Sequence, residues 1–380
     1  MPADQRPTQN QNTQTDAPPT TVLPLLADPE HYRACPWDLT VDHDMRAYWI
    51  DLFRGHFPSL LEEALREAQD RGEGLTSAQQ RAAQAQREFN AYLDRMSNPQ
   101  HHQGRLTILD ICLERERVLR RAKFDDPYRL AKARENQASL PLLPSVLAEL
   151  DALSADRREV EVIRGVFAGN IFDLGATQTA ALFQNGQRVS FQTSRQELRP
   201  RPWLVDDLDA WLDRMNQPPH RLALLFVDNA GPDIILGMIP LARHLLQRGT
   251  GVILTANTTP SLNDVTHQEL TGLIDRVAQF DPVIGEARTD NRLRLIASGN
   301  GAPLIDLSRL SPELVQAVEQ DLPDLVVLEG MGRAIESNFD ARFTCDALKI
   351  AMIKDPGVGQ KLGGEVYDLV FRFEPASGSA

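Results

Sequence analysis

The chain has 380 residues, a hydrophobic content of 42% and a formal net charge of −13 at neutral pH. This length allows a large core and favours two lobes, and the composition is typical of a soluble globular protein. The acidic balance argues against a general nucleic-acid-binding or membrane-surface protein, and no apolar run is long enough to span a membrane. Three widely spaced cysteines give neither a disulfide framework nor a zinc cluster, so we expect a reducing, cytoplasmic setting.

Residues 1–21 are rich in Gln, Thr, Asn and Pro and contain no apolar segment, which predicts a disordered tail. Residues 22–217 are predicted to form an extended arm and then an α-helical lobe, because apolar residues recur every three to four positions from about residue 42 onwards. Near the end of this lobe, polar residues and glycines interrupt the pattern around Asn170 and Asp173. These two side chains either cap a helix end or reach into the cleft between the lobes.

Residues 218–375 are predicted to form a second lobe with a different sequence pattern, and residues 376–380 are expected to be a short tail. Apolar runs of strand length alternate with helical patterns over most of this region, which is typical of a sheet with helices on both faces. We therefore predict an α/β fold, a Rossmann-like, doubly wound and mostly parallel sheet joined to an α-helical N-terminal lobe. The strand candidates are residues 222–228, 251–257, 292–298, 325–329, 348–354 and 366–373.

Polar pairs follow the first two of these strands. Asp228 and Asn229 end the first apolar run, and Asn263 and Asp264 follow the second. Each residue alone is well explained as a helix cap or turn residue, and Asp264 could cap the helix that begins near residue 265. Ligands of open α/β sheets bind beyond the carboxyl ends of the strands, where two carboxylates and an amide suit a hard divalent cation.

Two further segments carry candidate site residues. The strand at 325–329 ends in a glycine turn, Glu329, Gly330, Met331, Gly332 and Arg333, that can bring backbone N–H groups close to an anion. The third glycine of the dinucleotide fingerprint is missing, which argues against a nicotinamide or flavin site. Lys354 ends another apolar run and either neutralises a phosphate or extends from the strand edge into solvent.

Several collinear motifs resemble the metal-dependent damage-control phosphatases, the family first labelled domain of unknown function 89. The resemblance extends from about residue 32 to residue 374, and it is most similar to the branch with plant stand-alone enzymes and the C-terminal domain of animal pantothenate kinase 4. The motifs that carry it are Cys35-Pro-Trp-Asp-Leu, Arg134-Glu-Asn136, Gly169-Asn-Ile-Phe-Asp173, Phe226-Val-Asp-Asn-Ala-Gly-Pro-Asp, Pro260-Ser-Leu-Asn-Asp and Glu329-Gly-Met-Gly-Arg-Ala334.

The resemblance implies a divalent cation, Mg²⁺, Mn²⁺, Co²⁺ or Ni²⁺, in a cleft between the two lobes. The family's metal ligands fall on Asp228, Asn229 and Asp264, and its phosphate-side elements fall on the glycine turn and Lys354. Asn170 and Asp173 match the helical lobe's contribution, and Asn263 is expected to contact substrate. Two differences from relatives, Ala230 and the segment 257–260, leave the metal ligands intact and are expected to line the cleft, where they would bear on substrate choice.

The implied function is hydrolysis of a small phosphomonoester metabolite, with Asp228, Asp264 and Lys354 as catalytic residues. The nucleophile is either a water molecule or one of the two aspartates. Branch resemblance points to 4′-phosphopantetheine or its damaged forms, and a sugar phosphate is the alternative within the family. An S-adenosylmethionine-dependent methyltransferase and a non-catalytic phosphometabolite sensor are the alternatives from other classes.

Overall fold

The computed structural model describes residues 21–98, 104–171, 191, 195 and 197–376. The two tails expected from the sequence therefore lie almost wholly outside the described residues. Asp173, one of the predicted site residues, also lies outside them.

In the described part of the chain, seven strands form one sheet in the order β1-β7-β6-β5-β2-β3-β4. All neighbouring strands run parallel except the antiparallel pair β6 and β7. The mostly parallel α/β sheet predicted from the sequence is thereby confirmed, although the short β1 lies in a stretch expected to be helical, because two residues carry no periodicity. The strands are β1 (Val205–Asp206), β2 (Leu222–Phe226), β3 (Gly251–Ala256), β4 (Leu293–Ala297), β5 (Leu325–Glu329), β6 (Asp346–Met352) and β7 (Leu369–Glu374).

Alternate residues of each central strand enter two different cores, as the pleat of a strand requires. In β2, Leu222, Leu224 and Phe226 pack in the core that contains the N-terminal helices, whereas Ala223 and Leu225 pack in the core on the opposite face. Both faces of the sheet are therefore covered, which explains why the strands appear as unbroken apolar runs in the sequence.

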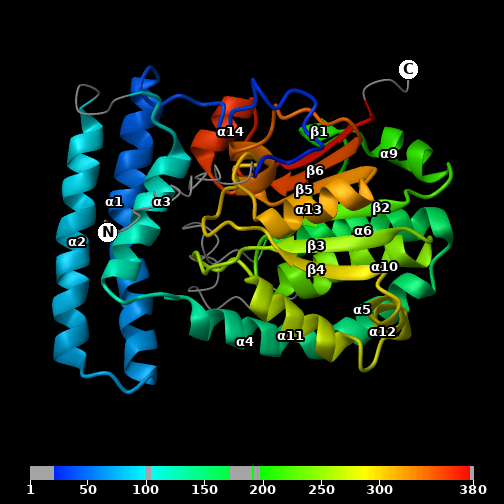
Figure 1. The fold of residues 1–380 in the computed structure, drawn as a ribbon, viewed down its shortest axis with the longest axis horizontal. Helices are drawn as coiled ribbons and strands as arrows, with labels where there is room; N and C mark the ends of the chain where they lie inside the picture. Colours follow the sequence, from blue (N-terminus) through cyan, green and yellow to red (C-terminus); the bar gives the residue numbers. More distant parts are fainter. Residues whose placement is uncertain (1–20, 99–103, 172–190, 192–194, 196, 377–380) are drawn as a thin grey trace, which may run out of the picture.

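Helices cover both faces and also form a separate group at one side (Figure 1). The α-helices are α1 (His43–Asp70), α2 (Leu75–Ser97), α3 (Ile108–Arg121), α4 (Arg129–Ser139), α5 (Leu143–Asp151), α6 (Ala155–Asn170), α9 (Leu208–Met215), α10 (Ile239–Gln247), α11 (His267–Val277), α12 (Pro282–Thr289), α13 (Pro312–Asp321) and α14 (Pro356–Leu362). A 3₁₀ turn, η2 (Leu140–Leu142), precedes α5, and two π-helical turns, η3 (Asp233–Met238) and η4 (Met331–Glu336), follow β2 and β5.

The long helices α1 and α2 lie side by side with α3 and stand apart from the sheet (Figure 1). The α1 helix begins where the Asp42 side chain accepts a hydrogen bond from the Met45 amide, and a capping box of Thr107 and Asp110 begins α3. Their apolar faces enter the same core as one face of the sheet. The helical group and the sheet are thus held together by packing.

The chain order places a topological switch point in the middle of the sheet. It runs from β2 outward through β3 to β4 and then crosses back to β5, on the other side of β2. Ligands of doubly wound sheets bind at the carboxyl ends of the strands at such a point. The ends of β2 and β5 are therefore the expected location of a site.

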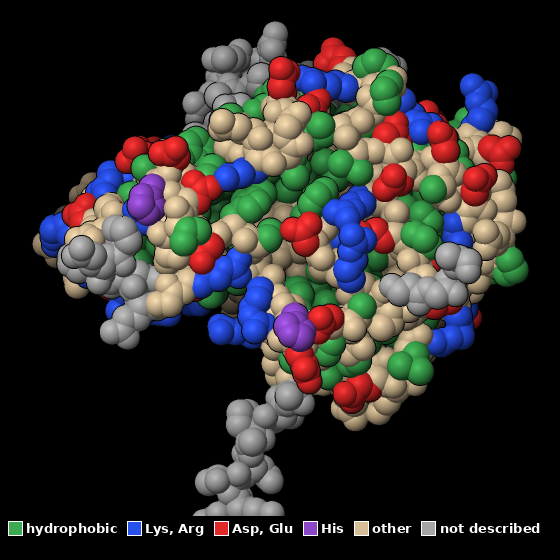
Figure 2. Space-filling model, turned by 90° about the horizontal axis from the view of Figure 1, so that it is seen from above, with side chains coloured by type: hydrophobic (Ala, Val, Ile, Leu, Met, Phe, Trp, Pro, Cys, Tyr) green, Lys and Arg blue, Asp and Glu red, His purple; other side chains and the backbone are tan. Residues whose placement is uncertain are grey.

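The remaining surface is mixed in charge on the face drawn in Figure 2, where basic and acidic side chains are interspersed. Many of the exposed charges are paired, for example Arg201 with Asp209 and Arg54 with Asp94. In the described part of the chain, no helix has the length and apolar character needed to cross a membrane.

Candidate active site

Backbone hydrogen bonds join the two polar segments that follow β2 and β3. The amide of Val265 donates to the carbonyl of Asp228 at 2.9 Å, and the amide of Ala230 donates to the carbonyl of Asn263 at 2.9 Å. Asn229 and Asp264 form the isolated antiparallel bridge between these bonds. The structure therefore brings together the three residues that the sequence identifies as metal ligands.

Asp264 is not the cap of the following helix. Thr266 takes that position, and its side chain forms a capping box with Glu269 at the start of α11. The Asp264 carboxylate points instead toward Asp228, and both side chains are buried. Of the two interpretations that the sequence allowed for Asp264, capping is wrong.

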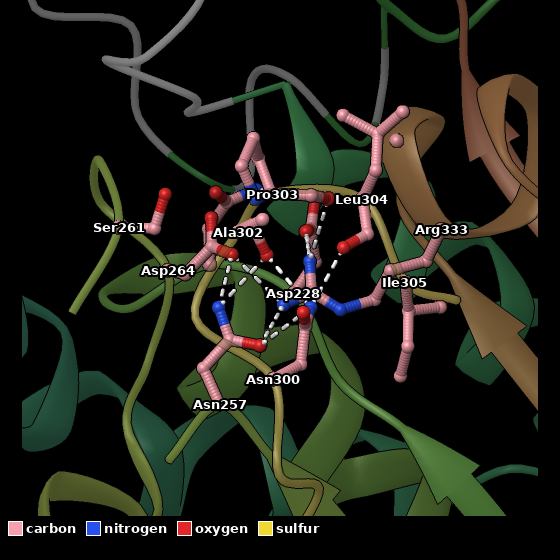
Figure 3. A network of polar contacts seen from close by, with 12 residues as sticks. Asp228, Asn257, Ser261, Asp264, Asn300, Ala302, Pro303, Leu304, Ile305 and Arg333 are labelled. Atoms are coloured by element: carbon pink, nitrogen blue, oxygen red, sulfur yellow. Dashed lines mark hydrogen bonds and ion pairs between the residues drawn. The ribbon is translucent and has the colours of Figure 1, made fainter. Parts of the chain in front are cut away.

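The Arg333 guanidinium lies between these two carboxylates (Figure 3). It forms an ion pair with Asp228 Oδ1, and its Nη2 donates to Asp264 Oδ2 at 2.8 Å and to Asn257 Oδ1 at 3.2 Å. Asn257 in turn donates to Asp264 Oδ2 at 2.8 Å. One oxygen of each carboxylate is thus held by fixed donors, and Arg333 is itself only 1% exposed.

A second network lies beneath the first. Asn170, the last residue of α6, donates to Glu329 Oε1 at 2.8 Å and to Asp233 Oδ2 at 3.0 Å. Asn229 donates to the same Asp233 oxygen and to Asp228 Oδ2, both at 2.9 Å. Asn170 therefore contacts two buried carboxylates of the site, and its predicted reach into the cleft stays a prediction.

Burial dominates the electrostatics of these carboxylates. It raises the pKa of Asp228 and of Glu329 well above their ordinary values, and it also raises the pKa of Asp233. The nearby charges of Arg333 and Lys354 oppose this effect at Asp228. A site with this excess of buried carboxylates favours an additional positive charge.

A cavity of about 670 Å³ opens beside the carboxylates. Of the residues predicted from the sequence, those that line it are Asp228, Asn229, Asn263, Asp264, Met331, Gly332 and Lys354. Asn170, Glu329, Gly330 and Arg333 lie behind this wall and do not line the cavity. Lys354 is 3% exposed, so the alternative of a lysine extending into solvent is wrong.

The glycine turn after β5 permits close backbone approach. Gly330 has φ +95°, and a Cβ atom built on it would lie 2.2 Å from Asp228 Oδ2. Its amide donates to the carbonyl of Ile350 at 3.0 Å and so is not available to an anion. The role of Gly330 is therefore to let Asp228 sit against the turn.

Sequence reasoning missed several residues of the site. Asp233, at the start of η3, was not identified, although it follows the Asp228–Asn229 pair at a spacing that a turn can fold back. The other wall of the cavity is formed by α1 and α3. The sequence of these two helices contains no polar motif that would indicate a site. Those lining residues are Tyr48, Trp49, Asp51, Leu52, Phe53, Gly55, His56, Ile108, Cys112 and Arg115.

The two positions where the chain differs from relatives were expected to line the cleft, and this expectation is wrong. Ala230 is fully buried, and its amide is used by the Asn263 carbonyl. Asn257 belongs to the Arg333 network, and no residue of the segment 257–260 lines the cavity. Ala230 and Asn257 are buried behind the carboxylates, whereas Thr258 and Thr259 are exposed outside the cavity.

The donor atoms fit a hard cation. Asp228, Asp233 and Glu329 each offer an oxygen, and these oxygens lie within 4.8 Å of one another. Asp233 Oδ1 is buried without a hydrogen-bond partner among the described residues. Carboxylate and amide oxygens without sulfur or imidazole match Mg²⁺ or Mn²⁺ chemistry. The site can therefore bind a metal ion.

Comparison with known proteins gives a family match and several similar relatives. The sequence model of the damage-control phosphatase ARMT1-like domain family matches residues 53–370 of this chain. An Arabidopsis thaliana protein named as a damage-control phosphatase is 39% identical over 93% of this chain and 96% of its own length. A Mus musculus 4′-phosphopantetheine phosphatase is 33% identical over 94% of this chain, and an Arabidopsis thaliana pantothenate kinase 2 is 40% identical over 95%.

The chain spans about half the length of these last two relatives, 49% of the mouse protein and 42% of the plant kinase. Among solved structures, a protein of the domain of unknown function 89 family from Pyrococcus horikoshii matches with a TM-score of 0.56. That match covers 85% of this chain and 96% of the archaeal chain at 14% identity, so it concerns the fold.

Proposed function

This chain belongs to the damage-control phosphatase ARMT1-like family, and we propose that it is a divalent-metal-dependent phosphatase acting on 4′-phosphopantetheine or its damaged forms. The observation that carries the proposal is the cavity, which has carboxylates, amides and a buried lysine at one place and a mainly apolar wall elsewhere. The similarity to a mouse protein named 4′-phosphopantetheine phosphatase supports the same substrate.

The apolar wall favours this substrate over a sugar phosphate. Trp49, Leu52, Phe53, Ile108 and Leu304 offer little to the ring of hydroxyl groups that a sugar presents. A phosphate ester of a long chain with methyl and methylene groups gains free energy from such a surface, at about 25 cal/mol per Å² of apolar area buried. The volume of about 670 Å³ accommodates such a chain.

Asp228, Asn229 and Asp264 would hold the cation, as the family resemblance implies. Asp233 and Glu329 offer further oxygens that lie within 4.8 Å of one on Asp228. A bound divalent cation supplies Lewis-acid polarisation of a phosphoryl oxygen. Lys354 is buried in the cavity wall and neutralises the phosphate charge, which in a low-dielectric site is worth more than in water. Asn263 Nδ2 is a buried donor without an acceptor among the described residues, and we assign it to a phosphate oxygen.

The residues around Asp228 and Asp264 also orient the groups that react when the phosphate ester is hydrolysed. Arg333 holds Asp228 Oδ1 and Asp264 Oδ2, Asn257 also donates to Asp264 Oδ2, and Asn229 donates to Asp228 Oδ2. Both carboxylates are therefore fixed in the positions in which they line the cavity. Asp228 or Asp264 then positions the attacking water, or attacks phosphorus itself to form a phospho-aspartate that water hydrolyses. In either route the bond between phosphorus and the alcohol oxygen breaks. The leaving alcohol carries the chain that lies along the α1 and α3 wall. We also propose a cytoplasmic location, which is supported by the three buried free cysteines.

Phosphate release by metal-stripped protein tests the proposal. The assay adds Mg²⁺, Mn²⁺, Co²⁺ or Ni²⁺ separately and compares 4′-phosphopantetheine, para-nitrophenyl phosphate and a panel of sugar phosphates. We expect metal-dependent release that is fastest from 4′-phosphopantetheine and is lost in Asp228→Asn. Asp209→Asn, which changes an exposed aspartate of α9, is the matched control and should retain activity.

The outcomes separate the alternatives. Preference for a sugar phosphate would select the other substrate class of the family. Binding of metal and phosphate ester without any release would favour a sensor. Product formation that requires S-adenosylmethionine and survives a chelator would favour a methyltransferase.

A further inference from the structure

Arg115 of α3 lines the cavity, and the phosphate chemistry described above does not use it. Its side chain is 4% exposed. Burying a guanidinium is costly unless its charge is paired and its N–H groups are satisfied. Nε and Nη2 donate to Glu116 Oε1 at 3.0 Å and 2.7 Å, and the Glu116 side chain is also 4% exposed. Together the two side chains form a buried pair with no net charge.

The pair is held in one position from two sides. The Arg115 guanidinium carbon lies 5.5 Å from the centre of the Phe53 ring on α1. The hydroxyl of Ser261 donates to Glu116 Oε1 at 2.9 Å. Ser261 belongs to the same loop as Asn263 and Asp264 and lies close to Asp264 (Figure 3). The guanidinium is therefore fixed relative to the carboxylate end of the cavity before any ligand binds.

The two terminal nitrogens of this guanidinium differ in their contacts. Within the described part of the chain, Nη1 of Arg115 donates no hydrogen bond, although the side chain lines the cavity. Because Glu116 already neutralises the charge, the position suits a neutral oxygen acceptor better than a second anion. The neighbouring lining residues Trp49, Phe53 and Ile108 are apolar, so they fit the alkyl part of the same ligand.

We propose that Arg115 determines specificity, with Nη1 donating to an amide carbonyl oxygen in the chain that is esterified to the phosphate. Trp49 and Phe53 pack against the alkyl groups beside that amide. The ligand class is a phosphomonoester whose alcohol carries a secondary-amide chain. This inference rests on the proposed function and assigns the part of the substrate that the phosphate site does not hold.

The test measures substrate selectivity with the full-length, metal-loaded protein. One variant combines Arg115→Met with Glu116→Gln, which removes both charges of the pair and keeps an acceptor for Ser261. A second, Arg115→Lys, keeps the charge and loses the planar fork. The substrates are 4′-phosphopantetheine and para-nitrophenyl phosphate, which has no amide. Circular dichroism and thermal unfolding report whether each variant folds.

We expect the ratio of kcat/KM for 4′-phosphopantetheine to that for para-nitrophenyl phosphate to fall about 10- to 100-fold, mainly through KM. Arg117→Met is the matched control, because Arg117 lies on the same helix with its side chain 64% exposed, and the ratio should not change. An unchanged ratio in both folded Arg115 variants overturns the proposal. An equal loss on both substrates also overturns it, because that is the result of a purely structural role.

Failure of the underlying function gives a different result. If the unaltered protein releases no phosphate from either substrate with any metal, the proposed phosphatase activity fails before Arg115 is tested. If the unaltered protein hydrolyses para-nitrophenyl phosphate but not 4′-phosphopantetheine, the phosphatase stands and the amide-chain assignment is overturned.

Discussion

Arg333 lies behind the cavity wall and touches both carboxylates expected to bind the cation. A planar guanidinium can hold one oxygen of each aspartate at the same time, whereas an ammonium is a single point charge. Groups that orient metal ligands in this way typically change metal affinity by about 10- to 100-fold when they are replaced. Arg333 is thus best described as a positioning residue, although its sequence position suggested a phosphate contact.

We predict that Arg333→Lys weakens Mn²⁺ binding to the metal-stripped protein by about 10- to 100-fold. The loss is expected because lysine keeps the charge but cannot fix both Asp228 and Asp264. Electron paramagnetic resonance of free Mn²⁺ measures the affinity without an activity assay. Arg294→Lys, at an ion pair with Asp321 away from the site, is the control. Unchanged or tighter binding in Arg333→Lys would contradict the positioning role.

Gly330 allows a comparison between backbone strain and steric overlap. Gly330 and Gly363 both have positive φ, +95° and +74°, but only a Cβ at Gly330 meets another atom, Asp228 Oδ2 at 2.2 Å. Gly363→Ala should cost about 1 kcal/mol of unfolding free energy through strain alone. Gly330→Ala should cost more than about 3 kcal/mol and also weaken Mn²⁺ binding, because Asp228 must move. Urea denaturation and the same Mn²⁺ titration check this, and equal costs at the two glycines would show that the overlap is relieved elsewhere.

At the scale of elements, α1 contacts the beginning of α14, directly after Lys354. The Tyr48 hydroxyl donates to Asp355 Oδ2 at 2.7 Å, and Asp355 Oδ1 accepts the Val358 amide as the cap of α14. Burial raises the pKa of Asp355, and the Tyr48 hydrogen bond lowers it. The contact therefore joins the helical group to the loop that carries Lys354.

Tyr48→Phe should reduce the unfolding free energy by about 1–3 kcal/mol, because it removes a hydrogen bond to a buried carboxyl group. It should also raise KM for the phosphate ester, since the Lys354 loop loses its connection to α1. Tyr92→Phe on α2 is the matched control, because no hydrogen bond to the Tyr92 hydroxyl is found in the described residues, and its effect should stay within about 0.5 kcal/mol. Urea denaturation and steady-state kinetics measure the two effects. Equal stability of the two variants would argue against a structural role for this contact.

How much of this the sequence could predict also differs by element. The apolar runs predicted the strands β2 to β7. The polar pairs after β2 and β3 predicted that Asp228, Asn229 and Asp264 lie close together, because the ends of parallel strands meet at one edge of the sheet. The α1 and α3 wall could not be predicted. Trp49, Phe53 and Arg115 have the spacing of an ordinary helical core, and only tertiary packing turns that face toward a cavity.

Asp233 and Arg333 show a second limit of sequence reasoning. Both lie at π-helical turns that follow strands, where an extra residue in the turn changes the direction of the side chains. A regular α-helical pattern gives the wrong direction for such residues. Their contacts with Asn229 and with Asp264 therefore depend on local geometry that composition and periodicity do not encode.

For the whole molecule, both hydrophobic cores contain residues from each side of the boundary predicted near residue 217. The sheet includes β1 at Val205–Asp206, before the boundary. Phe167 of α6 and Trp211 of α9 enter the same core as Leu225, Val327 and Ile350 of the central strands. The other face of the sheet shares its core with α1, α2 and α3. The division into lobes remains a prediction, which rests on the change from helical periodicity to alternating strand and helix patterns in the sequence.

Because both cores cross this boundary, we predict that the metal-stripped protein unfolds in a single cooperative transition. Calorimetry should give a van 't Hoff enthalpy equal to the calorimetric enthalpy within error. A fragment of residues 218–375 should fail to fold, since it would expose one face of the strands that α6 and α9 cover and the other face that α1 to α3 cover. Two separated transitions in the full chain, or a folded fragment with native circular dichroism, would instead establish independent lobes. In that case the cavity would be an interface between domains, and its residues on α1 and α3 would be free to move relative to Asp228 and Lys354.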